Sequence, residues 1–309
     1  MSVLALAGGV GGAKLANGLA AILPPETLTV AVNTGDDFEH MGLPISPDID
    51  SVTYALAGMN NVELGWGVAG ESWAFMDAMA RLHGETWFRL GDRDLATHIL
   101  RRQLLRQGNL SAATDDIRRR LGIAQKIVPM SDDPVRSIVS TDQGDLAFQD
   151  YFVRYQCTPR FLSIRFEGAE QARPSVGLLA AFDDPGLEAI IFCPSNPLLS
   201  IAPILAIPGV RERIASRRLP CVALSPFIAR QAVKGPAAKI MAELGIAATA
   251  AAVAAHYGDL IDGLVIDSAD ENPIADEGAT LFATDILMRD SADQQRLARE
   301  VLDFARRLT

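Results

Sequence analysis

The sequence predicts an α/β protein with a three-layer, Rossmann-like core whose sheet is mostly parallel, together with a helical lobe and a small strand-rich insertion. Two observations lead to this prediction. Short, continuously apolar runs alternate with longer helical patterns along the 309 residues. Runs without polar alternation are typical of strands covered on both faces, and therefore of a parallel sheet between helix layers.

Five apolar runs are predicted as strands of this sheet. They are residues 3–7, 28–32, 189–193, 221–224 and 263–266. Each run ends in small or polar residues, and ligands of open α/β sheets bind at the carboxyl ends of the strands. The loops that follow these runs are therefore the expected binding site.

The remaining segments predict how the chain is divided. Apolar spacing over residues 68–122 predicts a lobe that is helical throughout and ends near Gly122. Residues 137–175 are aromatic and partly alternating, which predicts a strand-rich insertion. The Rossmann-like core is then expected to comprise residues 1–136, which include the lobe, and 176–309.

Charge and composition exclude several classes of function. The chain has 28 Lys and Arg against 38 Asp and Glu, and its net charge of −10 repels nucleic acid and anionic membranes. Three cysteines without CxxC spacing favour a reducing, cytoplasmic compartment, and no histidine pairs with them at zinc-ligand spacing. The first apolar run lacks the basic flank of a signal peptide, and residues 246–255 are shorter than the ~20 of a membrane span.

The loop after the first strand is rich in glycine. Residues 8–15 are GGVGGAKL, in which Gly9, Gly11, Gly12 and Lys14 are candidates to hold a phosphate at the N-terminus of a helix. The loop matches neither the dinucleotide fingerprint nor the Walker A motif. The alternative is that the glycines serve only tight packing of strand against helix.

Acidic residues follow the second strand. The segments NTGDD (33–37) and SPDIDSV (46–52) supply carboxylates near the expected phosphate site, and Mg²⁺ is usually held by one or two carboxylates together with substrate phosphates. We expect Asp37 and Asp50 to be functional, as catalytic residues and metal ligands. Asp36 and Asp48 could instead cap turns and helices, and for Asp48 we favour capping.

Four further segments carry candidate residues. Residues 88–99, FRLGDRDLATHI, hold Arg89 and His98, which could recognise phosphate or carboxylate, or belong to a surface ion-pair network and to structural packing. The acidic pair in MSDDPV (130–135) could be a solvated turn. Ser195 and Asn196 follow a strand, and Gly235 precedes a helix that offers either a second anion cradle or a plain cap.

Taken together, these motifs resemble the 2-phospho-L-lactate transferase family of coenzyme F420 biosynthesis, over nearly the whole chain. The resemblance rests on seven segments in order: GGVGGAKL (8–15), NTGDD (33–37), SPDIDSV (46–52), GDRDLATHILR (91–101), PMSDDPV (129–135), PSNPLLSIAPIL (194–205) and AVKGPAAKIM (232–241). It implies transfer without a covalent enzyme intermediate. A three-carbon acid linked to guanosine diphosphate would be the donor, the ribityl 5'-hydroxyl of the deazaflavin Fo the nucleophile and GMP the leaving group, and Mg²⁺ would neutralise the diphosphate.

The resemblance also implies roles for single residues. Asp50 and Arg89, with His98 nearby in the same motif, would contact Fo, and Asp37 would bind the metal. The loop from Gly9 to Gly12 and the segments at Ser195, Asn196 and Gly235 would hold the guanylyl part. Two departures are that some relatives carry lysine in place of Arg89, and that Gly12 and Ala13 are this chain's variant of the first loop.

Several alternatives stay open from sequence alone. The chain could be a non-catalytic nucleotide-sugar-binding regulator resembling the gluconeogenesis factor, or a generic Mg²⁺-dependent nucleotidyltransferase. The donated acid could be phospholactate, phosphoenolpyruvate or phosphoglycerate. Asp50 as a general base toward the hydroxyl is a hypothesis, and a homodimer is expected because it is common for such folds.

Overall fold

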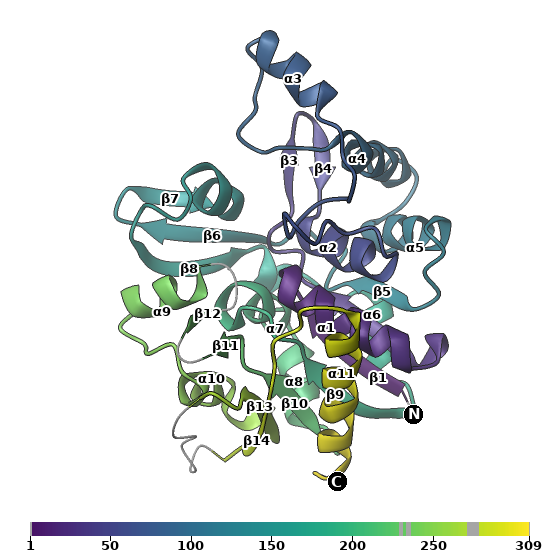
Figure 1. The fold of residues 1–309 in the computed structure, drawn as a ribbon, viewed down its shortest axis with the longest axis vertical. Coiled ribbons are helices and arrows are strands. Elements are labelled where there is room, and N and C mark those ends of the chain that lie inside the picture. Colours follow the sequence, from purple (N-terminus) through teal and green to yellow (C-terminus); the bar gives the residue numbers. More distant parts are fainter. Residues whose placement is uncertain (1, 229–230, 233–235, 271–277, 309) are drawn as a thin grey trace.

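The computed structural model describes residues 2–228, 231–232, 236–270 and 278–308. At its centre is a seven-stranded sheet in the order β14-β13-β10-β9-β1-β2-β5, in which every neighbouring pair is parallel (Figure 1). The strands are β1 (Ser2–Ala7), β2 (Leu28–Val32), β5 (Lys126–Pro129), β9 (Leu187–Phe192), β10 (Cys221–Leu224), β13 (Gly263–Asp267) and β14 (Thr280–Thr284). The predicted α/β, Rossmann-like class is confirmed.

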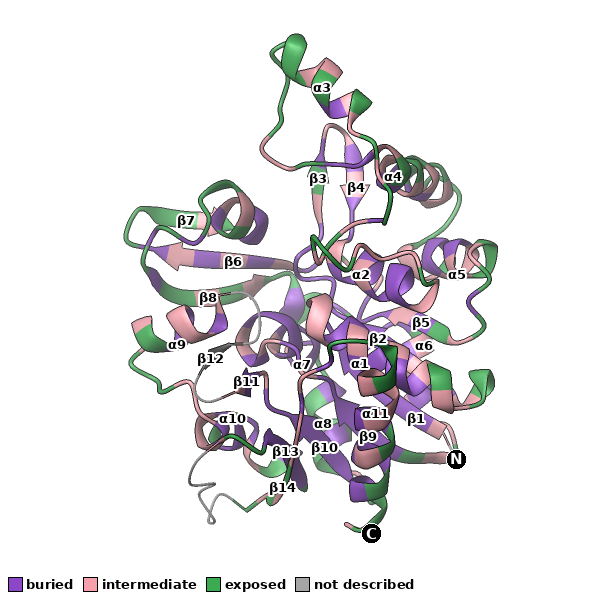
Figure 2. Cartoon of the chain, viewed as in Figure 1, coloured by how far each residue is buried: buried purple, intermediate pink, exposed green. Residues whose placement is uncertain are grey.

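Helices cover both faces of the sheet because its strands are apolar on both faces. Along β1, Val3 and Ala5 pack in one core and Leu4 and Leu6 in the other. The first core is formed with α1 (Gly9–Ile22), α2 (Pro47–Leu56) and α11 (Ser291–Arg306). The second is formed with α6 (Val176–Phe182), α7 (Ala202–Leu205), α8 (Val210–Ala215) and α10 (Ala250–Tyr257). In Figure 2 the central strands β1, β9, β10 and β13 between these layers are mostly buried.

The strand order reverses at β1. From β1 the chain proceeds to β2 and β5 on one side, then returns through β9 and continues to β10, β13 and β14 on the other. The carboxyl ends of β1 and β9 therefore flank a topological switch point, where open α/β sheets bind their ligands. The loops that follow them contain the predicted Gly9–Gly12 and Ser195–Asn196.

A lobe projects beyond the carboxyl ends of the strands (Figure 1). It consists of the hairpin β3 (Phe38–His40) and β4 (Leu43–Ile45) with α3 (Ala74–Arg81), α4 (Asp92–Leu105) and α5 (Leu110–Arg120). The prediction that 68–122 is helical throughout is wrong, because residues 82–91 are not helical: His83 has a φ of 56° and Leu90 turns inward onto Leu43, Ile45 and Met76.

The insertion is a three-stranded antiparallel sheet in the order β7-β6-β8. Its strands are β6 (Arg136–Thr141), β7 (Gly144–Ala147) and β8 (Phe161–Glu167), and α9 (Ala237–Glu243) packs beside β8. Short helical turns occur at residues 25–27, 150–154, 169–171, 197–201 and 258–260. Two short strands, β11 (Phe227–Ile228) and β12 (Gln231–Ala232), pair with each other. Within the described residues, no helix is long and apolar enough to cross a membrane.

Two elements of the core sheet carried no clear signal in the sequence. Strand β5 is four residues long, and β14 is an edge strand whose residues are half-buried or exposed. Helix α1 begins at Gly9, within the glycine-rich segment that was expected to form a loop before the helix. Its glycines are therefore part of the first helical turns.

The contact between α1 and α11 depends on Gly18. A methyl group at Gly18 would overlap the backbone carbonyl of Gln294 in α11. We expect Gly18→Ala to lower the free energy of unfolding by about 1–3 kcal/mol, because overpacking forces the two helices apart. Urea denaturation measures this, with Gly108→Ala as the control, since a methyl group there makes only ordinary contact with Ala112. Equal stability of the two variants would contradict the proposed role of Gly18.

Candidate functional site

The loops after β1 and β9 are joined by hydrogen bonds. The Gly8 amide donates to the Ser195 hydroxyl (3.0 Å), which in turn donates to the Gly8 carbonyl (2.8 Å). A methyl group at Gly11 would overlap the Pro194 carbonyl, and one at Gly12 would overlap the Ser195 hydroxyl. Gly11 and Gly12 therefore let the two loops approach closely, and Gly9, with a φ of 64°, begins the helix.

Asp48 connects this loop to the end of β2. One of its carboxylate oxygens accepts from the Gly9 amide (2.7 Å) and the other from the Asn33 side chain (2.9 Å). A carboxylate at the first amide of α1 is stabilised by the partial positive charge of a helix N-terminus. The expected capping role of Asp48 thus takes an unexpected form, since the helix that it caps is α1 and not its own helix α2.

The other predicted phosphate-binding residues are used differently. The Lys14 ammonium donates to the Met288 carbonyl (2.7 Å), on the segment before α11. The Asn196 side chain accepts from the amides of Leu198 and Leu199 and caps the short helix that follows β9. Gly235 lies outside the described residues. The structure therefore brings Gly9, Gly11, Gly12 and Ser195 together at the switch point.

Four buried carboxyl groups lie at the end of β2 and in the first turn of α2: Asp36, Asp37, Asp48 and Asp50. Burial raises the pKa of Asp37 to about 7 and that of Asp48 to about 6, and it raises the pKa of Asp36 well above its usual range. One oxygen of Asp37 accepts from the Ser46 hydroxyl (2.8 Å), while the other has no hydrogen-bond partner among the described residues. Asp37 therefore keeps one buried oxygen without a hydrogen-bond partner among the described residues.

Asp50 is held by an arginine that we did not predict. Both of its oxygens face the guanidinium of Arg101, and the Nη1–Oδ2 distance is 3.1 Å. His98 joins the pair, because its Nδ1 lies 3.1 Å from Nη1 of Arg101 and its Nε2 lies 3.1 Å from Asp94. The Tyr54 hydroxyl donates to the same Asp94 carboxylate (2.6 Å). The structure therefore brings His98 and Asp50 together in a buried polar network.

Arg89 is placed elsewhere. It is exposed, its guanidinium lies 4.2 Å from the ring centroid of Trp73, and Trp73 packs edge-on against Trp66. Among the described residues, no hydrogen bond or ion pair joins Arg89 to Asp50. Arg101 could have been found from spacing, since Asp94, His98 and Arg101 are four and three residues apart and so share one face of a helix.

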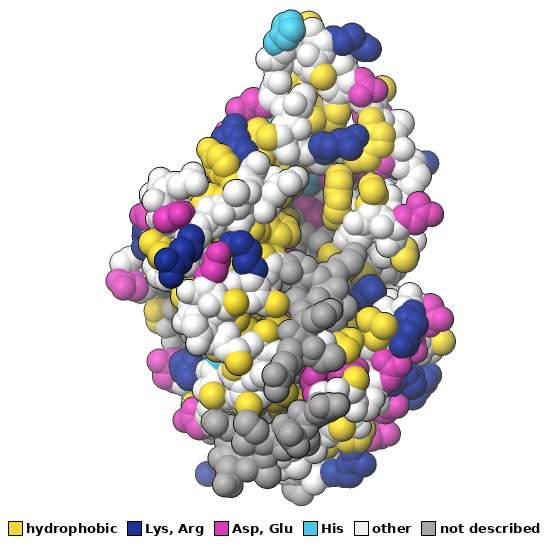
Figure 3. Space-filling model, turned by 60° about the vertical axis from the view of Figure 1, so that its left-hand side comes forward, with side chains coloured by type: hydrophobic (Ala, Val, Ile, Leu, Met, Phe, Trp, Pro, Cys, Tyr) yellow, Lys and Arg dark blue, Asp and Glu magenta, His cyan; other side chains and the backbone are white. Residues whose placement is uncertain are grey.

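A cavity of about 290 Å³ lies against the acidic edge. It is bordered by the end of β2, the β3–β4 hairpin, the α4–α5 turn and the end of β5. Its lining is Thr34, Asp37, Phe38, Pro44, Ile45, Ser46, Leu105, Gly108, Asn109, Leu110, Asp132, Asp133, Pro134 and Arg136. Figure 3 shows the molecule hollowed between the lobe and the body, with acidic side chains inside the hollow.

The acidic pair of the MSDDPV segment anchors this cavity. Asp132 accepts from the amide and hydroxyl of Ser111 and from the side chain of Asn109, which fixes the start of α5. Asp133 accepts from the Arg173 amide (2.9 Å). These carboxylates are therefore engaged with backbone and side-chain donors of neighbouring elements, unlike the solvated turn that was the default expectation.

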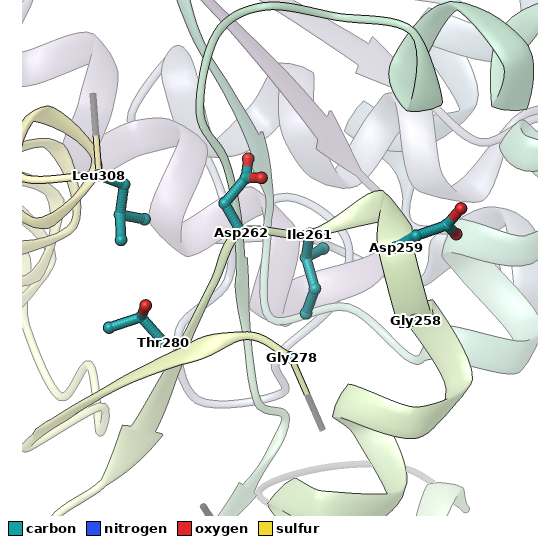
Figure 4. A pocket seen from close by; sticks show the side chains of 7 residues that line it. All are labelled: Gly258, Asp259, Ile261, Asp262, Gly278, Thr280 and Leu308. Atoms are coloured by element: carbon teal, nitrogen blue, oxygen red, sulfur yellow. The ribbon is translucent and has the colours of Figure 1, made fainter. Parts of the chain in front are cut away.

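A second pocket lies at the opposite edge of the sheet (Figure 4). It has a volume of about 550 Å³ and is lined by Gly258, Asp259, Ile261, Asp262, Gly278, Thr280 and Leu308, at the amino ends of β13 and β14. Its charged lining is acidic, and Asp262 is already paired with Arg217. This pocket offers no cation to a phosphorylated ligand from the residues that line it.

The carboxylates limit how Mg²⁺ could be held. In the part of the chain that the structure describes, no group of three or more His, Cys, Asp or Glu residues is arranged as a metal site. The unpartnered oxygen of Asp37 fits an ion held mainly by substrate phosphates, which is the usual mode for Mg²⁺. Asp50, whose two oxygens face Arg101, fits this role less well.

Comparisons with known proteins agree over the whole chain. The family model of 2-phospho-L-lactate transferase CofD matches residues 3–302. A phosphoenolpyruvate transferase of Kitasatospora aureofaciens is 43% identical over 99% of this chain and 98% of its own length. A 2-phospho-L-lactate transferase of Methanopyrus kandleri is 40% identical over 98% and 97%, respectively. A solved Bacillus halodurans protein of the UPF0052 family shares the fold, with a TM-score of 0.61, 14% identity and coverage of 97% of this chain and 98% of that one.

The raised pKa of Asp37 predicts how stability depends on pH. Because its folded-state pKa is about 7, folding favours the protonated carboxyl, and this contribution is lost as pH rises from about 4 through 7. We expect Asp37→Asn, which cannot ionise, to raise the unfolding midpoint by a few degrees at about pH 8 and to change it little at about pH 4. Circular dichroism in magnesium-free buffer measures this. The exposed Asp77→Asn is the control, and a destabilised Asp37→Asn at the higher pH would contradict the prediction.

Proposed function

The chain belongs to the 2-phospho-L-lactate transferase family, and from this membership we propose which group it moves and to which acceptor. It is a transferase of coenzyme F420 biosynthesis. The proposed reaction moves a phospho-three-carbon-acid group from its guanosine diphosphate-linked donor to the 5'-hydroxyl of the deazaflavin Fo and releases GMP. The single observation that supports it is that Asp48 connects the α1 N-terminus with the acidic edge beside the cavity.

The bond changes define what the site must do. The acceptor oxygen forms a bond to the phosphorus that carries the acid, the bond from this phosphorus to the bridging oxygen breaks, and GMP leaves with that oxygen and its electron pair. The hydroxyl loses its proton. Such a transfer needs positioning and charge neutralisation more than a nucleophilic side chain.

Asp37 is the residue that best fits the reacting end of the site. Asp37 lines the cavity, one of its oxygens has no hydrogen-bond partner among the described residues, and a carboxyl group with a pKa of about 7 can accept a proton near neutral pH. Mg²⁺, held by Asp37 and the donor phosphates, would neutralise charge on the diphosphate. Asp50 as the general base is less well supported, because Arg101 occupies both of its oxygens.

The cavity beside Asp37 is the proposed place for the acceptor. Phe38, Ile45 and Leu105 give it apolar walls suited to a planar ring, while Asp37 and Arg136 provide polar groups. The guanylyl part would lie toward Gly9, Gly11, Gly12 and Ser195 at the switch point. Arg89, as the resemblance implies, would reach the acceptor from the lobe.

The identity of the acid, the location and the assembly belong to the proposal as well. Relatives of similar identity are named for phosphoenolpyruvate and for 2-phospho-L-lactate, which supports these two acids as candidates; phosphoglycerate is a candidate from the sequence resemblance alone. We propose a cytoplasmic homodimer that uses no nucleic acid or membrane partner. Sedimentation equilibrium measures the assembly directly.

A single assay tests the reaction. We expect purified protein with Mg²⁺, Fo and one of the three donors to yield a phospho-acid adduct of Fo and an equal amount of GMP, detected by mass spectrometry. Asp37→Asn should lower turnover by about a hundredfold or more, because it removes a proton acceptor and a metal ligand. Asp77→Asn is the matched control. No adduct from any of the three donors, together with no change in Fo fluorescence on titration, would overturn the proposed function.

A further inference from the structure

We propose that Arg101 is a positioning residue that fixes Asp50 and one wall of the acceptor cavity. This inference rests on the proposed function, because the cavity is the proposed acceptor site. Arg101 lies in α4 and is 1% exposed, so its charge is almost entirely removed from water. A buried guanidinium is stable only with partners of good geometry.

The contacts of Arg101 reach both Asp50 and the cavity wall. Its two terminal nitrogens face the two oxygens of Asp50, in the bidentate arrangement that Arg favours with carboxylates. Nη1 also lies 3.4 Å from the Pro44 carbonyl, and Pro44 lines the cavity. The Asp50 amide donates to the carbonyl of Ser46, the residue that hydrogen-bonds Asp37. Arg101 therefore contacts the wall directly at Pro44 and is connected to Asp37 through Asp50 and Ser46.

A second set of contacts holds Arg101 in place. Asp94, His98 and Arg101 lie on one face of α4, and Asp50 and Tyr54 lie four residues apart on α2. His98 bridges Arg101 to Asp94, and Tyr54 donates to Asp94 from the opposite helix. The five side chains thus connect the lobe helix α4 to the core helix α2.

The position of α4 explains why this connection would affect one substrate more than the other. Leu105, at the end of α4, and Gly108, just beyond it, both line the cavity. The hydrogen bonds between Gly8 and Ser195, which hold the switch-point loops, do not involve α4. Loss of Arg101 would therefore disturb the cavity more than the nucleotide side, where Asp48 makes its own hydrogen bonds to Gly9 and Asn33.

The test compares acceptor binding with donor binding. Arg101→Gln should weaken Fo binding, measured by fluorescence titration, and raise the KM for Fo by about tenfold or more, with the KM for the donor within about twofold of wild type. Arg101→Lys, which keeps the charge but loses the fork, should recover part of the Fo affinity. The neighbouring, exposed Arg102→Gln is the matched control.

The possible outcomes separate the inference from the proposed function. Wild-type affinity for Fo in both Arg101 variants overturns the inference, and so does an equal loss of Fo and donor affinity, which marks a general structural role. If Arg101→Gln does not fold, the test uses Arg101→Lys, Asp50→Asn and the double variant that combines them. Because the two residues are coupled, the double variant should bind Fo little more weakly than the weaker-binding single variant. Additive losses overturn the inference. Wild-type protein that does not bind Fo overturns the proposed function, and the inference with it.

Discussion

The structure depends on how it accommodates four carboxyl groups buried at one edge of the sheet. Burying a charge is costly unless it is paired or neutralised, and each of the four meets this constraint differently. Asp50 is paired with Arg101, and Asp48 takes two donors from the β1–α1 loop and from β2. Asp36 and Asp37 keep raised pKa values and one unpartnered oxygen each. The carboxyl groups with an unpartnered oxygen are thus Asp37, which borders the cavity, and Asp36, which lies in the loop after β2.

The candidate site therefore has two sides that differ in how fully their polar groups are hydrogen-bonded: the Gly8–Ser195 loops form a rigid side, and Asp37 lies on a side that can respond to a ligand. On the rigid side, Ser195 and Gly8 are hydrogen-bonded in both directions, and the glycines leave no space between the loops. On the responsive side, Asp37 has a partner on one oxygen only. A cation or a proton would bind favourably at Asp37, because it would neutralise a buried carboxylate that lacks a full set of hydrogen-bond partners.

The sequence predicted those parts of the site that follow directly from strand ends. Gly9 and Ser195 were expected to lie together because the carboxyl ends of parallel strands meet at one edge, and they do. The partner of Asp50 was not predicted because Arg101 is 51 residues away along the chain; its spacing with Asp94 and His98 indicates a shared helix face but not which carboxylate lies opposite. The hydrogen bond from the Gly9 amide to Asp48 was not predicted either, because the two residues are distant in sequence and meet only in the folded chain. Strands β5 and β14 were missed because short or half-exposed edge strands carry little apolar signal.

The pairing of α1 with α11 has a consequence for how the chain acquires its structure. The opening βα unit is covered by the helix Ser291–Arg306, and β1 lies between β2 and the much later β9. During synthesis, the part of α1 that α11 covers stays exposed until the ribosome has released almost the whole polypeptide, whereas β1, β2 and α2 are available early. The packing of the first βα unit is therefore completed last, although this unit emerges first, and interrupted translation products would expose an apolar surface of α1.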